Sequence, residues 1–279
     1  MVSTPISSSE SADESSDMYT LLRDAIRAEQ PVALATLIRR VGEGLVGGHL
    51  LIRPGQPVIG TLGDEELDRV VARDSEGELS AGLTSTRHYG PKGEARQEGV
   101  SVFVESFSPP PRMVIFGAVD FTAALVRAAK LLGYRVTVCD ARPVFATKQR
   151  FPLADEVIND WPDRYLDAHG QALGPADVVC VLTHDPKFDV PAITAAVKTK
   201  VGYLGAMGSR KTHNTRTDRL REAGLSEDQI ARVMGPIGID IGARTPEETA
   251  ISIVAEIIAL RTGRAVASLR DGDGPIHRR

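Results

Sequence analysis

The stretch from Met113 to Asp140 constrains the fold more than any other part of the chain. Met113 to Phe116 is a short apolar run, typical of a buried parallel strand, and Gly117 interrupts it. Apolar residues then recur with the helical period, and residues 134–140 form a second strand-like run that ends in a carboxylate. A strand, a tight turn, a helix and a second strand ending in an acid are the β-α-β layout of a dinucleotide-binding half-domain.

The glycine fingerprint at this turn is incomplete. A full G-x-G-x-x-G needs a second glycine for the approach of a pyrophosphate and a third for close helix packing. Val119 and Thr122 occupy those two positions. Two interpretations stay open, a Rossmann-type layer with no tight nucleotide site at this turn and an anion site at the free N–H groups of the following helix. Asp120, in the first turn of that helix, either caps it or contacts a ligand.

The order of strand, turn and helix repeats further along the chain. Residues 177–183 read as a central parallel strand, and residues 201–204 read as the next strand, followed by a glycine-containing turn at 205–211. A capping box then opens an apolar helix at about 245–261. We therefore predict an α/β fold whose C-terminal domain is a Rossmann-like doubly wound parallel sheet. The last helix is apolar on most sides, which favours coverage by the first domain or by a second copy, as in a homodimer.

The N-terminal half is predicted to be a smaller α+β domain. Apolar residues at helical spacing begin at Leu21, strand candidates follow at 32–38 and in a hairpin, and a short helix is expected at 65–73. Residues 145–151 are also expected to form a short helix, within the C-terminal domain. The expected organisation, divided by the triple proline after Ser108, is a disordered tail at 1–17, an N-terminal domain at 18–108, a Rossmann-like domain at 112–263 and a flexible tail at 264–279.

Charge and hydropathy exclude several classes of protein. The formal net charge of −4 and the pI near 5.9 argue against sequence-independent nucleic-acid binding, which needs a basic surface. No apolar run approaches the roughly 20 residues that cross a bilayer, and the N-terminus lacks a signal-peptide pattern, so we expect a cytoplasmic protein without a membrane span. The two cysteines, Cys139 and Cys180, lie in apolar runs, which favours buried thiols over reactive or disulfide-bonded ones.

A phosphorylated cofactor would bind such a sheet at the carboxyl ends of its strands, near the switch in strand order. The cofactor-binding candidates at these ends are Gly117, Ala118, Asp140, His184, Asp185, Gly208, Ser209 and Arg210. Asp140 either bonds a sugar hydroxyl or pairs with Arg142, and Ser209 with Arg210 either contacts an anion or serves as a helix cap.

The sequence assigns no metal ligand and no catalytic residue. His184, Asp185 and Asp189 could bind a hard cation, but three such residues in one loop more often form turns. No pattern of paired carboxylates or of a nucleophile with its base supports hydrolytic chemistry.

Five long segments carry a resemblance to a known family. They are RFPLADEV (150–157), LTHDPKFD (182–189), YLGAMGSRKTH (203–213), LREAGLSEDQIAR (220–232) and GPIGIDIGARTPEETAISIVAEI (235–257). In this order they resemble the C-terminal half of the XdhC/CoxI family. The N-terminal half resembles the family's smaller domain more loosely, through PVALATLIRR (31–40) and VSVFVE (100–105).

The resemblance implies an accessory protein for molybdenum hydroxylases such as xanthine dehydrogenase and carbon monoxide dehydrogenase. Such a protein would bind the molybdenum cofactor, molybdopterin or its cytosine dinucleotide form, aid its sulfuration and insert it into the hydroxylase subunits. A cysteine desulfurase is a further implied partner. The alternatives are an NAD(P)-dependent oxidoreductase, which the β-α-β layout alone favours, and a non-catalytic binding module with a vestigial pocket.

The chain departs from the family pattern at its thiols. The family's N-terminal domain usually carries one cysteine in a Ser-Gly-Gly-Cys stretch and another in a Gly-Leu-Thr-Cys-Gly-Gly stretch. The corresponding residues here are 61–65 and 82–86, which contain Asp64 and Ser85 in place of cysteine. Neither side chain replaces a thiolate as a soft ligand for molybdenum or sulfur. The family's Gly-Ala-Gly-His turn is also altered, at residues 117–120.

Overall fold

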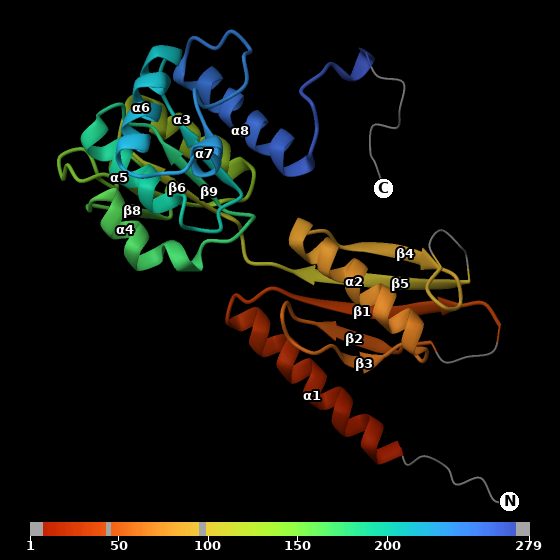
Figure 1. Ribbon diagram of the computed structural model, residues 1–279. Coiled ribbons are helices and arrows are strands. Elements are labelled where there is room, and N and C mark those ends of the chain that lie inside the picture. Colours follow the sequence, from red (N-terminus) through yellow and green to blue (C-terminus); the bar gives the residue numbers. More distant parts are fainter. Residues whose placement is uncertain (1–7, 43–45, 95–98, 272–279) are drawn as a thin grey trace, which may run out of the picture. The chain divides into compact units, whose positions relative to one another are not determined.

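A computed structural model describes residues 8–42, 46–94 and 99–271 (Figure 1). The chain divides into two compact units between Pro109 and Pro110, inside the triple-proline segment. Each unit is described by itself below.

The N-terminal unit is an antiparallel sheet with one helix on each face. The strand order is β3-β2-β1-β5-β4. Its elements are α1 (Ser8–Arg27), β1 (Val32–Arg40), β2 (His49–Ile52), β3 (Ile59–Thr61), α2 (Glu65–Ala81), β4 (Ser85–Tyr89) and β5 (Val100–Phe107).

Alternation of apolar side chains along β1 explains why both faces of this sheet are covered. Leu37 lies with Leu67 of α2 in one buried cluster. Leu34 lies with Leu22 of α1 in another. Because successive side chains of a strand point to opposite faces, one apolar strand can serve two helices.

The C-terminal unit is a six-stranded parallel sheet between two helical layers. The strand order is β11-β10-β9-β6-β7-β8, and every adjacent pair is parallel. Its main elements are β6 (Arg112–Phe116), α3 (Asp120–Leu131), β7 (Arg135–Cys139), β8 (Glu156–Ile158), α4 (Pro162–His169), β9 (Val178–Val181), α5 (Pro186–Ala196), β10 (Tyr203–Ala206), α6 (Arg210–Glu222), α7 (Glu227–Ala231), β11 (Val233–Met234) and α8 (Pro246–Thr262). The predicted fold class, a doubly wound α/β sheet preceded by an α+β domain, is confirmed.

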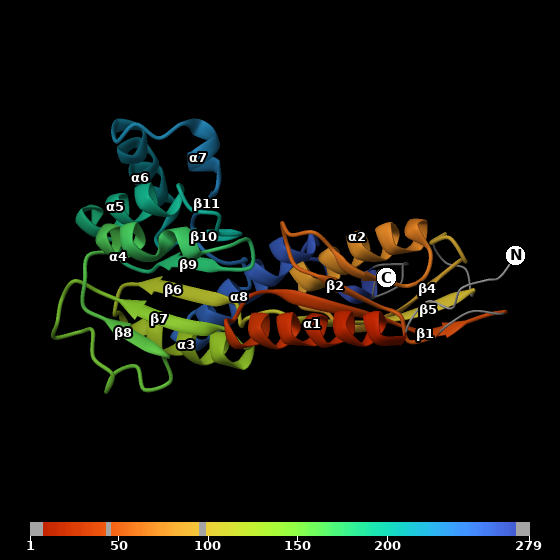
Figure 2. The ribbon, with the colours of Figure 1, turned by 90° about the horizontal axis from the view of Figure 1, so that it is seen from below.

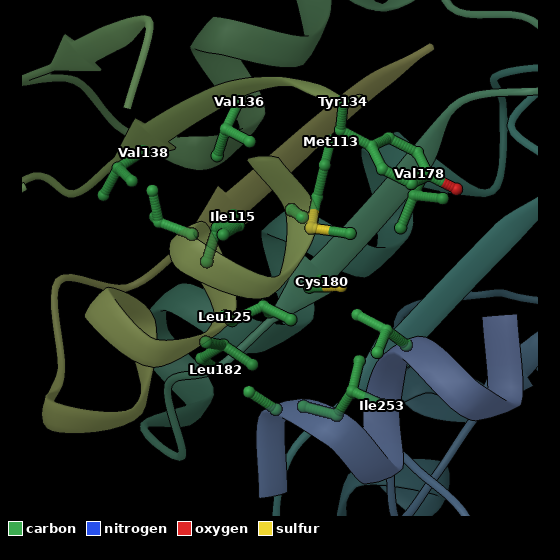
Figure 3. Close-up of a cluster of buried hydrophobic side chains, with 14 of the residues drawn as sticks. Met113, Ile115, Leu125, Tyr134, Val136, Val138, Val178, Cys180, Leu182 and Ile253 are labelled. Carbon is green, nitrogen blue, oxygen red and sulfur yellow. The ribbon is translucent and has the colours of Figure 1, made fainter. Parts of the chain in front are cut away.

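The two faces of the parallel sheet have separate buried cores. Figure 2 shows α4, α5 and α6 on one side of the sheet and α3 with α8 on the other. Figure 3 shows the core beneath α3 and α8, where Leu125 and Ile253 approach Met113, Ile115 and Cys180 of the strands. Because helices cover both faces, the central strand β9 is apolar along its whole length, as the sequence indicates.

Several local predictions from the sequence are wrong. The first helix begins at Ser8, well before Leu21, so the second half of the predicted disordered tail is helical, and residues 1–7 lie outside the described residues. Helix α2 continues to Ala81, past the predicted end at residue 73, because Leu79 is buried in the core. Residues 145–151 form turns in place of a helix.

The chain after α8 is only partly described. Helix α8 ends at Thr262 and is capped by Gly263 in the left-handed conformation. Of the predicted tail, only a short 3-10 turn, Leu269–Asp271, is regular within the described part. Residues 272–279 lie outside it.

Helix α8 buries Ile253 and Ile257 and exposes Ile251 and Leu260. Across the described residues, no helix is both long and apolar enough to span a membrane.

Candidate functional site

The carboxyl ends of the four central strands meet at one edge of the parallel sheet. Gly117 follows β6, Asp140 follows β7, His184 follows β9 and Gly208 lies after β10. Strands β6 and β9 are neighbours, but the helices that follow them, α3 and α5, cover opposite faces. This is the switch in strand order beside which ligands bind in open α/β sheets.

Gly117 brings the turn after β6 against the neighbouring strand end. Its φ is +114°, and a Cβ atom at this position would lie 2.8 Å from Cγ2 and 3.1 Å from the backbone nitrogen of Thr183. Only glycine permits both the backbone angle and the approach. The hydroxyl of Thr122 donates to the Gly117 carbonyl at 2.6 Å and accepts from the Val119 amide at 3.2 Å, so it closes the turn from within.

Asp140 is bonded within the protein. Its Oδ2 accepts from the Ala118 amide at 2.7 Å, and the guanidinium of Arg142 donates to both carboxylate oxygens at 2.7 and 2.9 Å. Burial by itself would raise the pKa of Asp140, but the bonds from Arg142 and Ala118 outweigh burial and hold this pKa below its usual value. The pairing with Arg142, which the sequence left as one alternative for Asp140, is therefore present in the structure.

Cations and aromatic rings flank this turn. Arg150 donates to the Ala118 carbonyl at 3.1 Å, so both polar groups of residue 118 have partners. The guanidinium of Arg142 lies 4.6 Å from the ring centre of Phe145, and Phe188 stacks on Trp161 with ring centres 5.1 Å apart. The wall beside Asp140 thus combines positive charge with planar surface, a combination that suits an anionic, planar ligand.

The carboxylates after β9 make hydrogen bonds within the protein. Asp185 caps α5 by accepting from the Lys187 amide at 3.0 Å. Asp189 is buried and turned toward Thr183 and Arg216. The described residues contain no group of three or more His, Cys, Asp or Glu side chains arranged to hold a metal ion.

Gly208 and Ser209 shape the start of α6. Gly208 has a φ of +144°, and Ser209 caps the helix by accepting from the Thr212 amide at 3.1 Å. Arg210 is exposed. Of the two alternatives for Ser209, the structure therefore shows its hydroxyl as the cap of α6.

A cavity of about 210 Å³ opens between α5 and α6, and three cations that line it are not among the candidates that the sequence predicts. His184 lines it from the segment before α5, and Lys211, Arg216 and Arg219 line it from α6. The sequence did contain a usable signal. Lys211, Thr215 and Arg219 recur at spacings of four, which places them on one helix face.

A buried ion pair forms the floor of this cavity. Arg216 donates to Oδ2 of Asp189 from Nη2 at 2.8 Å and from Nε at 3.3 Å, and from Nη2 to the Met207 carbonyl at 2.6 Å. Both side chains are at most 4% exposed. The Thr183 hydroxyl donates to the other oxygen of Asp189. Through Thr183 and Met207, the pair therefore links α5 and α6 to the segments that follow β9 and β10.

The two thiols of the chain are buried in the sheet. Cys139 lies at the end of β7 and Cys180 in β9, and both are free. Burial raises the pKa of Cys139 to about 12 and also raises that of Cys180. Neither is a thiolate at neutral pH, so neither offers a soft ligand at the site.

Family comparisons cover most of this fold. Residues 113–257 match the model described as the XdhC Rossmann domain, and residues 25–90 match the model of the XdhC and CoxI family. The chain belongs to the XdhC and CoxI family. The resemblance predicted from the five segments is confirmed.

Curated relatives in this family align with the chain over part of their length. A protein of Bacillus subtilis (strain 168), named as a probable component of xanthine dehydrogenase, is 34% identical, over 60% of this chain and 48% of its own. The molybdenum cofactor insertion chaperone PaoD of Escherichia coli (strain K12) is 28% identical, over 57% of this chain and 43% of its own. An uncharacterized protein of the same strain, YqeB, is 27% identical over 83% of this chain and 44% of its own. The aligned part thus spans less than half of each relative.

A solved structure shares the fold of both units. The crystal structure of a xanthine dehydrogenase from Bacillus halodurans aligns with 90% of this chain and 97% of its own, with a TM-score of 0.51 and 22% sequence identity. Because the sequence identity is only 22%, this likeness is evidence for the fold of the chain and for nothing further.

The positions that the family resemblance assigns to cysteine have structural hydrogen bonds in this chain. Asp64 caps α2 by accepting from the Leu67 amide at 3.0 Å. Ser85 in β4 donates at 2.7 Å to Glu78, a buried carboxylate that also accepts from Arg87. The N-terminal unit of this XdhC and CoxI family member thus uses both positions for its own stability.

Proposed function

We propose that this chain is an accessory protein that carries the molybdenum cofactor to a molybdenum hydroxylase of the xanthine dehydrogenase or carbon monoxide dehydrogenase type. The match of residues 113–257 to the XdhC Rossmann domain carries the proposal. Two relatives support it, one named as a component of xanthine dehydrogenase and the other as a molybdenum cofactor insertion chaperone.

The strand ends suit the polar, phosphorylated part of such a cofactor. Gly117, Asp140, His184 and the turn at Gly208 border one edge of the sheet, and Arg142 and Arg150 add positive charge there. The remaining candidates of the sequence, Ala118, Asp185, Ser209 and Arg210, shape the same edge. The two buried thiols do not suit the metal end, so we propose that the cofactor is held through its pterin and phosphate groups.

Hydride transfer from NAD(P) is a weaker candidate. The carboxylate that would bond a ribose, Asp140, is already bonded to Ala118 and Arg142. Val119 stands where the pyrophosphate would come nearest to the backbone. These contacts favour a carrier over an oxidoreductase.

Deletion of the gene for this chain tests the proposed role in cells. We expect the hydroxylase to be produced at its usual level but with little molybdenum and little activity, because insertion fails while cofactor synthesis continues. Molybdenum content of the purified hydroxylase and total cellular molybdopterin are the measurements, and reintroduction of the gene is the control. A hydroxylase with its normal molybdenum content in the deletion strain would rule the role out.

A further inference from the structure

The cavity between α5 and α6 contains a buried cation with an unused hydrogen-bond donor. Arg216 is 4% exposed, and its Nε and Nη2 groups are occupied by Asp189 and the Met207 carbonyl. Its Nη1 is buried and makes no hydrogen bond to any described residue. Buried guanidinium donors are normally all bonded, so this atom leaves room for a hydrogen-bond acceptor from outside the described residues, such as a bound anion.

The charge of the lining specifies the sign of that group. Lys211, Arg216 and Arg219 are positive, and Asp189, already paired with Arg216, is the carboxylate in the lining. Within the described part of the chain, the Lys211 and Arg219 side chains have no ion-pair partner. An anion in the cavity would therefore contact three cations, and only one of them, Arg216, is already paired with a carboxylate.

The size of the cavity limits which part of a ligand it can take. Its volume of about 210 Å³ is below the roughly 300–1,000 Å³ of pockets that enclose a drug-sized ligand. A phosphate or pyrophosphate group fits this volume better than a complete cofactor. His184, which follows β9 at the switch in strand order, is one of the residues that line the cavity, so the cavity borders the candidate site at this residue.

We propose that the cavity between α5 and α6 is a phosphate-binding site that receives the phosphorylated end of the carried cofactor, with Arg216, Lys211 and Arg219 as its contacts. The identity of the carried molecule rests on the proposed function, whereas the anion site rests on the cavity. Arginine and lysine in a partly enclosed cavity form charge-assisted hydrogen bonds to phosphate oxygens.

Calorimetric titration of the full chain with inorganic pyrophosphate tests this site. We expect the double variant Lys211→Gln/Arg219→Gln to bind pyrophosphate about tenfold or more weakly than the wild type, because two charge-assisted contacts are lost. Both side chains are exposed, so folding should persist. The matched control is Lys198→Gln/Lys200→Gln, which removes the same charge beyond the other end of α5 and should bind as the wild type does.

Two results would overturn the site. The first is that titration of the wild type with pyrophosphate gives no measurable heat of binding. The second is that the control variant loses as much affinity as Lys211→Gln/Arg219→Gln, because the loss would then come from the change in net charge alone. A second variant, Arg216→Lys, keeps the charge opposite Asp189 but removes Nη1, and should also weaken binding once its fold has been checked by fluorescence.

The same variants separate this site from the proposed function. Wild-type protein that binds pyrophosphate in the cavity but carries no molybdopterin would refute the carrier role and leave the anion site in place. Wild-type and Lys211→Gln/Arg219→Gln proteins that carry equal molybdopterin would refute the site for the carried cofactor and leave the carrier role in place.

Discussion

Replacement of Asp189 by alanine should lower the free energy of unfolding of the C-terminal unit by about 3–5 kcal/mol. The substitution leaves the buried guanidinium of Arg216 without its counter-ion and leaves the Thr183 hydroxyl without its acceptor. Urea unfolding followed by tryptophan fluorescence measures the loss in this unit. The chain has a single tryptophan, Trp161, which lies at the start of α4 and stacks on Phe188.

An exposed ion pair on the same helix as Arg216 provides the control. Asp218 contacts Arg221 at 3.0 Å, but both side chains are about half exposed or more. Because water and salt screen such pairs, Asp218→Ala should leave the unfolding midpoint almost unchanged. Equal and small shifts for the two variants would mean that the buried pair does not hold β9, α5 and α6 together.

Gly117→Ala should cost about 2–5 kcal/mol in the same measurement, from backbone strain at positive φ together with a steric contact. The added methyl group would lie 2.8 Å from Cγ2 of Thr183 and 3.1 Å from its backbone nitrogen. The Thr183 side chain could rotate, but its backbone follows Leu182, whose amide donates to the Phe116 carbonyl at the end of β6, so it cannot move without disturbing the pairing of β9 with β6. The turn after β6 would therefore shift away from the strand end that it contacts.

Gly133→Ala is the matched control for backbone strain. Gly133 also has a positive φ, +80°, but a Cβ there would meet no atom within 4 Å. It should cost about 1–2 kcal/mol, the strain alone. If Gly117→Ala cost no more than this, the close contact with Thr183 would be absorbed by local movement, and the turn would not be fixed.

The sequence predicts the architecture of the C-terminal unit well because its signals are local. Residues 113–116 and 178–182 are apolar runs of strand length, and the helix between the first two strands carries a clear 3.6-residue period. Strand order cannot be read from such patterns, but alternation of strands and helices allows few arrangements. The start of the first helix is predicted too late, because residues 8–17 are mostly polar and show no apolar helix face in the sequence.

The site was only partly predictable because hydrogen-bond partners depend on tertiary structure. From the sequence, Ala118 is a cofactor-binding candidate at one glycine-containing turn, and Ser209, at the other, is either an anion contact or a helix cap. In the structure, the Ala118 amide donates to Asp140, and the Ser209 hydroxyl accepts from Thr212. The unused donor lies instead on Arg216, whose burial depends on the packing of α5 against α6 and has no signature in a polar helix.

Molybdopterin content of the purified chain is the most direct test of the carrier role. The chain would be produced in cells that synthesise the molybdenum cofactor, purified without denaturation, and its pterin counted by fluorescence after oxidation, before and after alkylation of accessible thiols. We expect pterin in stoichiometric amount, unchanged by alkylation, because Cys139 and Cys180 are buried. A chain that purifies without pterin, while the hydroxylase from the same cells is loaded with cofactor, would contradict the account.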